Sequence, residues 1–299
     1  MLSSFRQPRR RWQRLVSSLT GADTLRRLSA VTIAATTPSV HTAEVGDVGA
    51  RVVFLHGLLG QGKNFATIAR ALQPRFRSLL VDLPNHGRSA WTEDFGYELF
   101  ADLVADRLRD GFAADGPVHV VGHSMGGKVA MVLALMHPEM VDRLVVVDIS
   151  PAGGGDEGEF EHLLDSLADL DLSTVSRRAE ADERLSGPID DARVRGFLLQ
   201  NLRSDERGFN WQANLELLRR ELPAIGGFPN DLTDTFTRPV LWVAGDRSPY
   251  VRPEHEAGMR RLFPRTTQVT IKHAGHWVHS EQPQGFVSAL DIFLDDSRG

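Results

Sequence analysis

The chain of 299 residues carries 34 basic and 39 acidic side chains and a net charge of −5. Its 41% hydrophobic and 24% charged residues are typical of a soluble globular protein and exclude a largely disordered or fibrous chain. No apolar run approaches about 18 residues, so we expect no transmembrane helix. Cysteine is absent, which excludes disulfides, thiolate nucleophiles and cysteine-ligated metals. Any nucleophilic side chain must therefore use oxygen or nitrogen.

Positive charge is concentrated at the N-terminus. Residues 1–28 hold seven arginines against Asp23 alone, a charge of +6 that leaves −11 for the rest of the chain. We expect no binding of nucleic acid by this acidic body. The stretch after Arg9-Arg10-Arg11 is too short and polar for the apolar region of an export signal. We therefore expect a flexible basic tail on a cytoplasmic protein, with targeting or membrane-surface contact as the alternatives and the oligomeric state left open.

From about residue 30, apolar β-rich runs alternate with segments of helical spacing. This alternation predicts an α/β fold with a mostly parallel central sheet flanked by helices. The expected strands are 31–37 and 41–48, as an antiparallel pair, then 51–55, 77–81, 118–121, 144–147, 239–243 and 268–271. The expected helices are 65–72, 97–109, 125–136 and 253–262.

One long stretch interrupts the alternation. Between Ser150 and Thr237 the strands give way to amphipathic helical spacing, as in Trp211-Leu215-Leu218. This pattern predicts a helical cap inserted into the sheet domain. The expected organisation is a tail at 1–28, an α/β core in two parts at 29–151 and 237–299, and a helical cap at 152–236.

The strongest functional signal is Gly122-His-Ser-Met-Gly126, a G-x-S-x-G segment between an apolar strand and a helix. Two glycines permit a sharp strand-to-helix turn that presents the Ser124 hydroxyl above the sheet. The alternative is an ordinary tight turn with an incidental serine. In this strand–turn–helix context the motif predicts that Ser124 is a nucleophile.

A serine hydroxyl needs a general base, normally a histidine that a carboxylate orients. In this arrangement the acid and then the histidine follow the nucleophile along the chain. His276 follows a glycine in the loop after the last expected strand, and we predict it as the base, with His273 and His279 as alternatives. A zinc site is not predicted, because these three histidines lie in a loop that holds no carboxylate among them.

The acid has two candidates. Asp246 lies in the loop after the penultimate strand, but Ser248 occupies the position where the acid commonly stands. Beside Arg247, Asp246 could instead form a salt bridge or a turn. Asp148 ends the strand that follows Ser124 and can reach the same histidine, or could cap the first turn of the cap. We favour Asp148, with Ser248 hydrogen-bonding in the same network.

Acyl transfer also needs donors for an oxyanion. The Met125 amide follows the nucleophile, and the Leu58 amide lies in the glycine-containing loop 56–60. The alternative for this loop is a purely structural glycine turn. Trp211, Phe228 and Tyr250 are candidates for an acyl pocket beneath the cap, with core packing as the alternative.

Lys128 stands four residues after Ser124 on the same expected helix. It could form an ion pair on the helix surface, contact the cap or meet an anionic substrate.

Several motifs together resemble a known family. They are Phe54–Gly60, Asp82–Ser89, Gly122–Lys128, Val147–Pro151, Phe209–Trp211, Ser248–Val251 and Gly275–His279. They resemble the α/β-hydrolase superfamily and, more narrowly, the YbfF-like bacterial esterases with their mitochondrial abhydrolase relatives. The resemblance implies a serine esterase or thioesterase with a small helical lid, in which the acid is Asp148. The tail and Pro84 depart from the family pattern.

The function we expect is hydrolysis of a carboxylic ester or thioester of a small acyl substrate, with no metal or cofactor. A serine at position 124 argues against dehalogenases and epoxide hydrolases, which need an aspartate there. A cofactor-free perhydrolase of the haloperoxidase type, a carbon–carbon bond hydrolase and a non-catalytic ligand-binding protein remain as alternatives.

Overall fold

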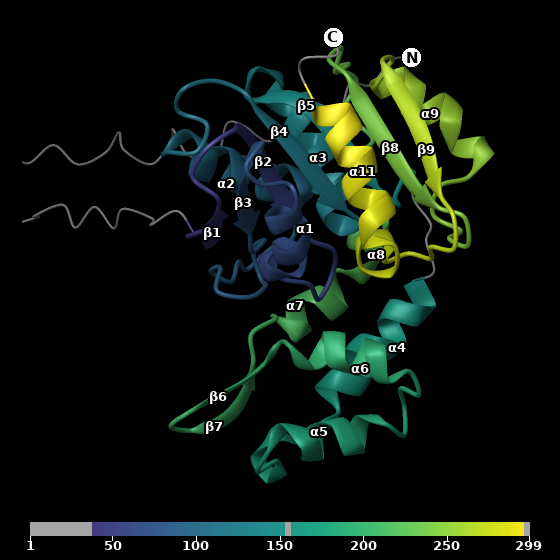
Figure 1. Cartoon of the computed structure of the whole chain (residues 1–299). Coiled ribbons are helices and arrows are strands. Elements are labelled where there is room, and N and C mark those ends of the chain that lie inside the picture. The colour runs from purple at the N-terminus through teal and green to yellow at the C-terminus, as the bar shows by residue number, and fades with distance from the viewer. Residues whose placement is uncertain (1–37, 153–156, 296–299) are drawn as a thin grey trace, which may run out of the picture. The chain divides into compact units, whose positions relative to one another are not determined.

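The computed structural model describes residues 38–152 and 157–295 (Figure 1). The predictions for the tail at 1–28 and for a strand at 31–37 lie outside these ranges. Within them the chain forms a seven-stranded sheet, helices on both of its faces, and a separate two-stranded sheet. None of the helices in these ranges is both long and apolar enough to cross a membrane.

The large sheet has the strand order β1-β3-β2-β4-β5-β8-β9. Only β1 runs antiparallel to its neighbour, β3, and the other pairs are parallel. Strands β4 and β8 are buried along their whole length, which explains their unbroken apolar runs. The mostly parallel sheet that the sequence predicts is therefore confirmed. The strands are β1 (Thr42–Val45), β2 (Ala50–Leu55), β3 (Phe76–Val81), β4 (Val118–His123), β5 (Val141–Val147), β8 (Val240–Gly245) and β9 (Thr266–Ile271).

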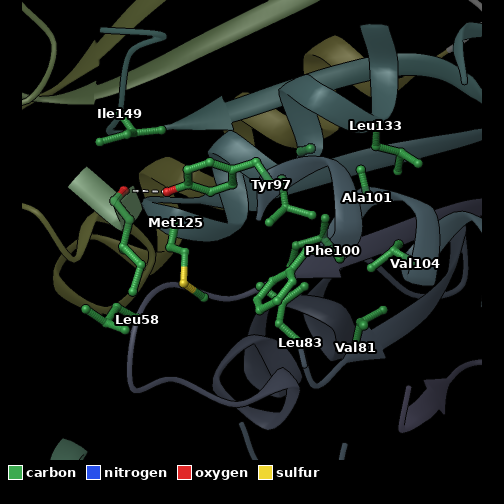
Figure 2. Packing of buried hydrophobic residues seen from close by; sticks show 14 of the residues in the cluster. Leu58, Val81, Leu83, Tyr97, Phe100, Ala101, Val104, Met125, Leu133 and Ile149 are labelled. Carbon is green, nitrogen blue, oxygen red and sulfur yellow. Dashed lines mark hydrogen bonds between the residues drawn. The ribbon is translucent and has the colours of Figure 1, made fainter. Parts of the chain in front are cut away.

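Two hydrophobic clusters lie on opposite faces of this sheet, because successive side chains of a strand point to opposite sides. Val53 and Leu55 of β2 belong to one cluster, and Val52 and Phe54 belong to the other. The first cluster takes residues from α2, α3 and α9, and Figure 2 shows part of it. The second takes residues from α1 and α11. These helices are α1 (Ala66–Ala71), α2 (Tyr97–Arg109), α3 (Met125–Met136), α9 (Glu256–Leu262) and α11 (Pro283–Leu294).

Short helical turns join several of these elements. The predicted helices at 65–72 and 253–262 each begin with a 3-10 turn, while α2 and α3 begin and end at the predicted residues. The turns are η1 (Gly62–Phe65), η2 (Pro138–Met140) and η4 (Pro253–His255), and the four-residue α10 (Val278–Glu281) precedes α11.

Between β5 and β8 the chain is mainly helical, as predicted, but it also contains a β-hairpin. Trp211 lies in β7 and pairs with Leu202 of β6, so the prediction that helical spacing starts at Trp211 is wrong. Asp205 and Gly208 pair on either side of the two-residue loop, and Gly208, the first residue of β7, adopts a φ of 114° that glycine allows. The elements are α4 (Glu157–Ala168), η3 (Leu172–Thr174), α5 (Arg178–Leu185), α6 (Ala192–Leu199), β6 (Leu202–Asp205), β7 (Gly208–Trp211), α7 (Leu215–Arg220) and α8 (Leu222–Gly226).

Candidate active site

Ser124 lies at the sharp turn between β4 and α3. Its backbone has φ 53° and ψ −122°, a conformation that non-glycine residues rarely adopt. The turn depends on two glycines without a Cβ. A Cβ on Gly122 would lie 2.2 Å from the Gly126 carbonyl oxygen, and one on Gly126 would lie 2.4 Å from the His56 carbonyl oxygen. The close approach of these backbone segments therefore holds Ser124 in its strained position.

His276 connects Ser124 to Asp148. Its Nε2 lies 3.0 Å from Ser124 Oγ, and its Nδ1 lies 2.8 Å from Asp148 Oδ2. Because a carboxylate only accepts hydrogen bonds, the Nδ1–H of His276 donates to Asp148 and leaves Nε2 to accept from the serine hydroxyl. The His276 side chain is 11% exposed and that of Asp148 is fully buried. Three residues that lie far apart in the sequence are thus joined in one hydrogen-bond chain.

The Asp148 carboxylate is held by further donors. The Gly245 amide donates to Oδ1 at 3.0 Å, and the Ser248 hydroxyl donates to Oδ2. These contacts offset the cost of burying a charged group. Asp148 itself follows β5 with a φ of 52°, and its amide bonds to the carbonyl of Val243 in β8. The ends of β5 and β8 therefore set the direction of the carboxylate.

The other candidates lie elsewhere. Asp246 is near Lys272, with Oδ2 and Nζ 3.9 Å apart. This distance fits the salt-bridge alternative, with Lys272 rather than Arg247 as the partner. His273 is exposed, and its Nδ1 accepts from Arg247 at 3.2 Å. Of the two acid candidates, only Asp148 is hydrogen-bonded to His276.

The two oxyanion candidates lie near Ser124. Met125 is the first residue of α3, so its amide has no acceptor within the helix. Leu58 lies in the loop after β2 and lines the same pocket as Ser124. Both side chains are buried (Figure 2).

Two buried histidines shape the loop that carries Leu58. His56 donates from Nδ1 to the Gly57 carbonyl at 2.8 Å and accepts at Nε2 from the Leu83 amide. His86 accepts at Nε2 from the Leu59 amide at 3.1 Å. Burial lowers the pKa of His56. Burial also lowers the pKa of His86, and the nearby His56 adds to this effect, so that the pKa of His86 is about 3. Both rings are therefore neutral and serve as fixed donors and acceptors for this loop.

Two more buried histidines surround the ring of His276. His123 donates from Nε2 to the His276 carbonyl at 2.8 Å, and its ring centroid lies 4.8 Å from that of His279. Burial, assisted by the neighbouring His276, lowers the pKa of His123 well below its ordinary value and that of His279 to about 4. These two rings are therefore neutral near pH 7.

The pocket at Ser124 is small and aromatic. Its volume is about 20 Å³, room for one water molecule. Tyr250, one of the predicted pocket residues, lies with its ring 4.2 Å from that of His276. None of the three predicted pocket residues lines this pocket: Tyr250, Trp211 and Phe228 all pack against the first hydrophobic cluster. The pocket is lined by aromatic residues that the sequence analysis did not assign to it: Phe65, Phe160, Phe197 and Trp277.

A larger cavity of about 420 Å³ adjoins this pocket. Asn64, Phe197, Trp277 and His279 line both spaces. Among these aromatic pocket residues, only Trp277 could have been predicted from the sequence, because it directly follows the candidate base His276. Phe197 comes from α6, whose place beside the site depends on how the segment between β5 and β8 packs.

Comparison with known proteins identifies the class. The model of the alpha/beta hydrolase fold family matches residues 50–283, so the chain belongs to the α/β-hydrolase family. It is 42% identical over 250 residues to the sn-1-specific diacylglycerol lipase ABHD11 of Mus musculus, covering 81% of this chain and 80% of the relative. It is 29% identical over 245 residues to the esterase YbfF of Escherichia coli, covering 82% and 93%.

A solved structure titled as a marine microorganism esterase is similar with a TM-score of 0.82 and 31% identity, covering 86% of this chain and 99% of that one. The resemblance to YbfF-like esterases and their abhydrolase relatives is therefore confirmed. The relatives named here are esterases and lipases, which supports a hydrolase activity for this chain.

Proposed function

We propose that this chain is a serine hydrolase that cleaves carboxylic esters or thioesters of small acyl substrates through a covalent acyl-enzyme. The observation that carries the proposal is the unbroken hydrogen-bond chain from Ser124 Oγ through His276 to Asp148. A protein that only binds a ligand has no need of an aligned base and acid. The names of the relatives, a diacylglycerol lipase and esterases, favour ester hydrolysis over perhydrolysis or carbon–carbon cleavage.

In the first half of the reaction, Ser124 Oγ attacks the acyl carbon while His276 Nε2 takes the hydroxyl proton. The carbonyl electron pair moves onto oxygen, and the amides of Leu58 and Met125 donate to this oxyanion. Asp148 keeps the ring of His276 in the required tautomer and stabilises the imidazolium. The tetrahedral intermediate then collapses, the bond to the alcohol or thiol breaks, and His276 returns the proton to this leaving group.

In the second half, water attacks the acyl carbon of the acyl-enzyme. His276 takes a proton from this water, and the second tetrahedral intermediate is held by the same two amides. Its collapse breaks the bond to Ser124 Oγ, which regains a proton from His276. The carboxylic acid leaves and the free enzyme is restored. The full cycle consumes only the substrate and one water molecule.

The substrate class follows from the walls of the site. The small aromatic pocket suits an apolar group next to the reacting carbonyl. The adjoining cavity of about 420 Å³ has room for the larger part of the substrate. Its lining includes Arg193 and Glu281, so it accommodates a more polar group than the inner pocket does.

The test is hydrolysis of p-nitrophenyl esters from acetate to palmitate, together with acyl thioesters of the same chain lengths, by wild type and Ser124→Ala. We expect turnover by wild type and a loss of at least about 10⁴-fold in kcat for Ser124→Ala. The chain-length optimum and the ester-to-thioester ratio then define the substrate class. If no ester or thioester is cleaved, or if Ser124→Ala retains full activity, the proposal fails.

A further inference from the structure

Lys128 is a buried cation on the helix that follows the nucleophile. Its side chain is on α3, one turn after Ser124, and the residue is 3% exposed. The Lys128 amide bonds to the Ser124 carbonyl at 3.1 Å. Because Lys128 is buried, it does not lie on the helix surface, where one of the three interpretations of the sequence placed it. The structure instead supports contact with the segment between β5 and β8.

The ammonium of Lys128 binds the end of α8. It donates to the carbonyls of Gly226 and Gly227 at 2.6 and 2.7 Å, and to that of Ile225 at 3.4 Å. The last carbonyls of a helix lack donors within the helix and carry the negative end of its dipole. An ammonium group, with three N–H donors and a positive charge, suits these acceptors.

Tyr97 of α2 supports the same helix end. Its hydroxyl donates to the Ile225 carbonyl, the hydrogen bond drawn in Figure 2. The Lys128 ammonium lies 5.9 Å from the centre of the Tyr97 ring, within the range of a cation–π contact. Two of the helices that cover this face of the sheet, α2 and α3, therefore hold the end of α8.

The position of α8 bears on the reaction site. Helix α8 packs against α4. Phe160 of α4 lines the pocket at Ser124, and its ring centroid lies 6.4 Å from that of His276. A displacement of α8 therefore allows α4, and with it Phe160, to move away from His276.

We propose that Lys128 is a positioning residue that fixes α8 and α4 over the reaction site by binding the carbonyls of residues 225–227. Ser124 is the N-cap of α3 and Lys128 lies in the first turn of that helix, so the nucleophile and the attachment point of the covering segment move together. Lys128 does not contact the reacting atoms. The kinetic part of this inference rests on the proposed ester hydrolysis, whereas the structural part does not.

The test compares hydrogen–deuterium exchange in wild type, Lys128→Met and Lys128→Arg. Methionine has a similar length but removes the side-chain donor to the carbonyls of Gly226 and Gly227, whereas arginine retains a cation with several N–H groups. We expect the amides of α8 and α4 in Lys128→Met to exchange about tenfold faster, with β4 and β8 unchanged. In Lys128→Arg we expect exchange of α8 and α4 close to that of wild type. Unchanged exchange of α8 in folded Lys128→Met, or equal acceleration in all elements, would overturn the proposal.

Kinetics supply the second readout. For Lys128→Met we expect KM for p-nitrophenyl esters to rise about tenfold while kcat changes less than KM, because Lys128 positions the segment that carries Phe160 and does not contact the reacting atoms. A loss confined to kcat, with KM unchanged, contradicts a positioning role.

If Lys128→Met does not fold, Lys128→Gln takes its place, since glutamine keeps two N–H donors but no charge, and the same outcomes apply. The exchange measurement needs no turnover, so failure of the ester-hydrolase proposal is distinguishable from failure of this one.

Discussion

Ser248 donates its hydroxyl hydrogen to Asp148 Oδ2, the same oxygen that lies 2.8 Å from His276 Nδ1. The loop after β8 therefore contributes a donor that orients the carboxylate, while the carboxylate itself comes from the end of β5. The Gly245 amide, from the end of β8, binds the other carboxylate oxygen at 3.0 Å. The ends of the two neighbouring strands, β5 and β8, thus together orient the Asp148 carboxylate towards His276.

Asp148→Asn is expected to reduce kcat for p-nitrophenyl acetate by about 10³–10⁴-fold, because an amide in place of the carboxylate favours the wrong tautomer of His276. Asp246→Asn is the matched control, since Asp246 lies near Lys272 and is not bonded to His276. We expect this control to stay within about threefold of wild type. A larger loss in Asp246→Asn than in Asp148→Asn would make Asp246 the acid.

Ser248→Ala removes one of the donors to Asp148 but leaves the Gly245 amide in place. We expect kcat/KM to fall about tenfold, the value of one hydrogen bond to a charged group. Ser248→Thr retains the hydroxyl and is expected to recover most of the activity. Steady-state kinetics with one ester measure both variants. A loss in Ser248→Ala as large as that in Asp148→Asn, or no loss at all, is inconsistent with an auxiliary role.

Gly126→Ala places a Cβ 2.4 Å from the backbone oxygens of Leu55 and His56. Because neither oxygen is on a flexible side chain, we expect unfolding to become easier by about 3 kcal/mol or more. Gly196→Ala in α6 is the control, since nothing lies within 4 Å of the added Cβ, and it is expected to be neutral or stabilising. Urea denaturation followed by circular dichroism compares the two variants. Equal stability of both would show that the turn at Ser124 does not need its close backbone approach.

His279 makes the folded state sensitive to acid. Burial and the neighbouring His276 lower its pKa to about 4, whereas an unfolded histidine titrates near its ordinary pKa of 6.5. The unfolded state therefore binds more protons below about pH 6.5, and the stability due to neutral His279 is lost as pH falls from 6.5 towards 4. At pH 5 the loss from this one group is about 2 kcal/mol relative to pH 7.

His279→Phe removes this titration while keeping an aromatic ring stacked on Phe65, whose centroid lies 4.5 Å from that of His279. We expect the decrease in free energy of unfolding between pH 7 and pH 5 to be smaller in this variant by about 2 kcal/mol. Urea titrations at the two pH values measure the difference. An identical pH dependence in wild type and variant would contradict a lowered pKa for His279.

The sequence predicts most of the sheet and the residues at its ends, because buried parallel strands and the G-x-S-x-G turn have strong local signals. Helices α2 and α3 also begin and end at the predicted residues. The hairpin β6–β7 was missed because its strands are short and its two-residue loop, Glu206-Arg207, lacks the usual Asn-Gly or Asp-Gly signal.

Local sequence patterns do not predict contacts between residues that lie far apart in the chain. Phe160 and Phe197 reach the pocket only through the packing of α4 and α6, which no local periodicity encodes. The burial of Lys128 depends on carbonyls about 100 residues away in the chain, so its sequence position alone could not distinguish a surface ion pair from a contact with the cap.

The central claim is that Ser124, activated by His276, forms a covalent bond with the substrate carbonyl. The most direct measurement is labelling with a fluorophosphonate, followed by intact mass and peptide mapping. We predict one label per chain, on Ser124, loss of ester turnover in proportion to labelling, and much slower labelling of His276→Ala. A label on another residue, or ester turnover that continues after Ser124 is fully labelled, would contradict the account.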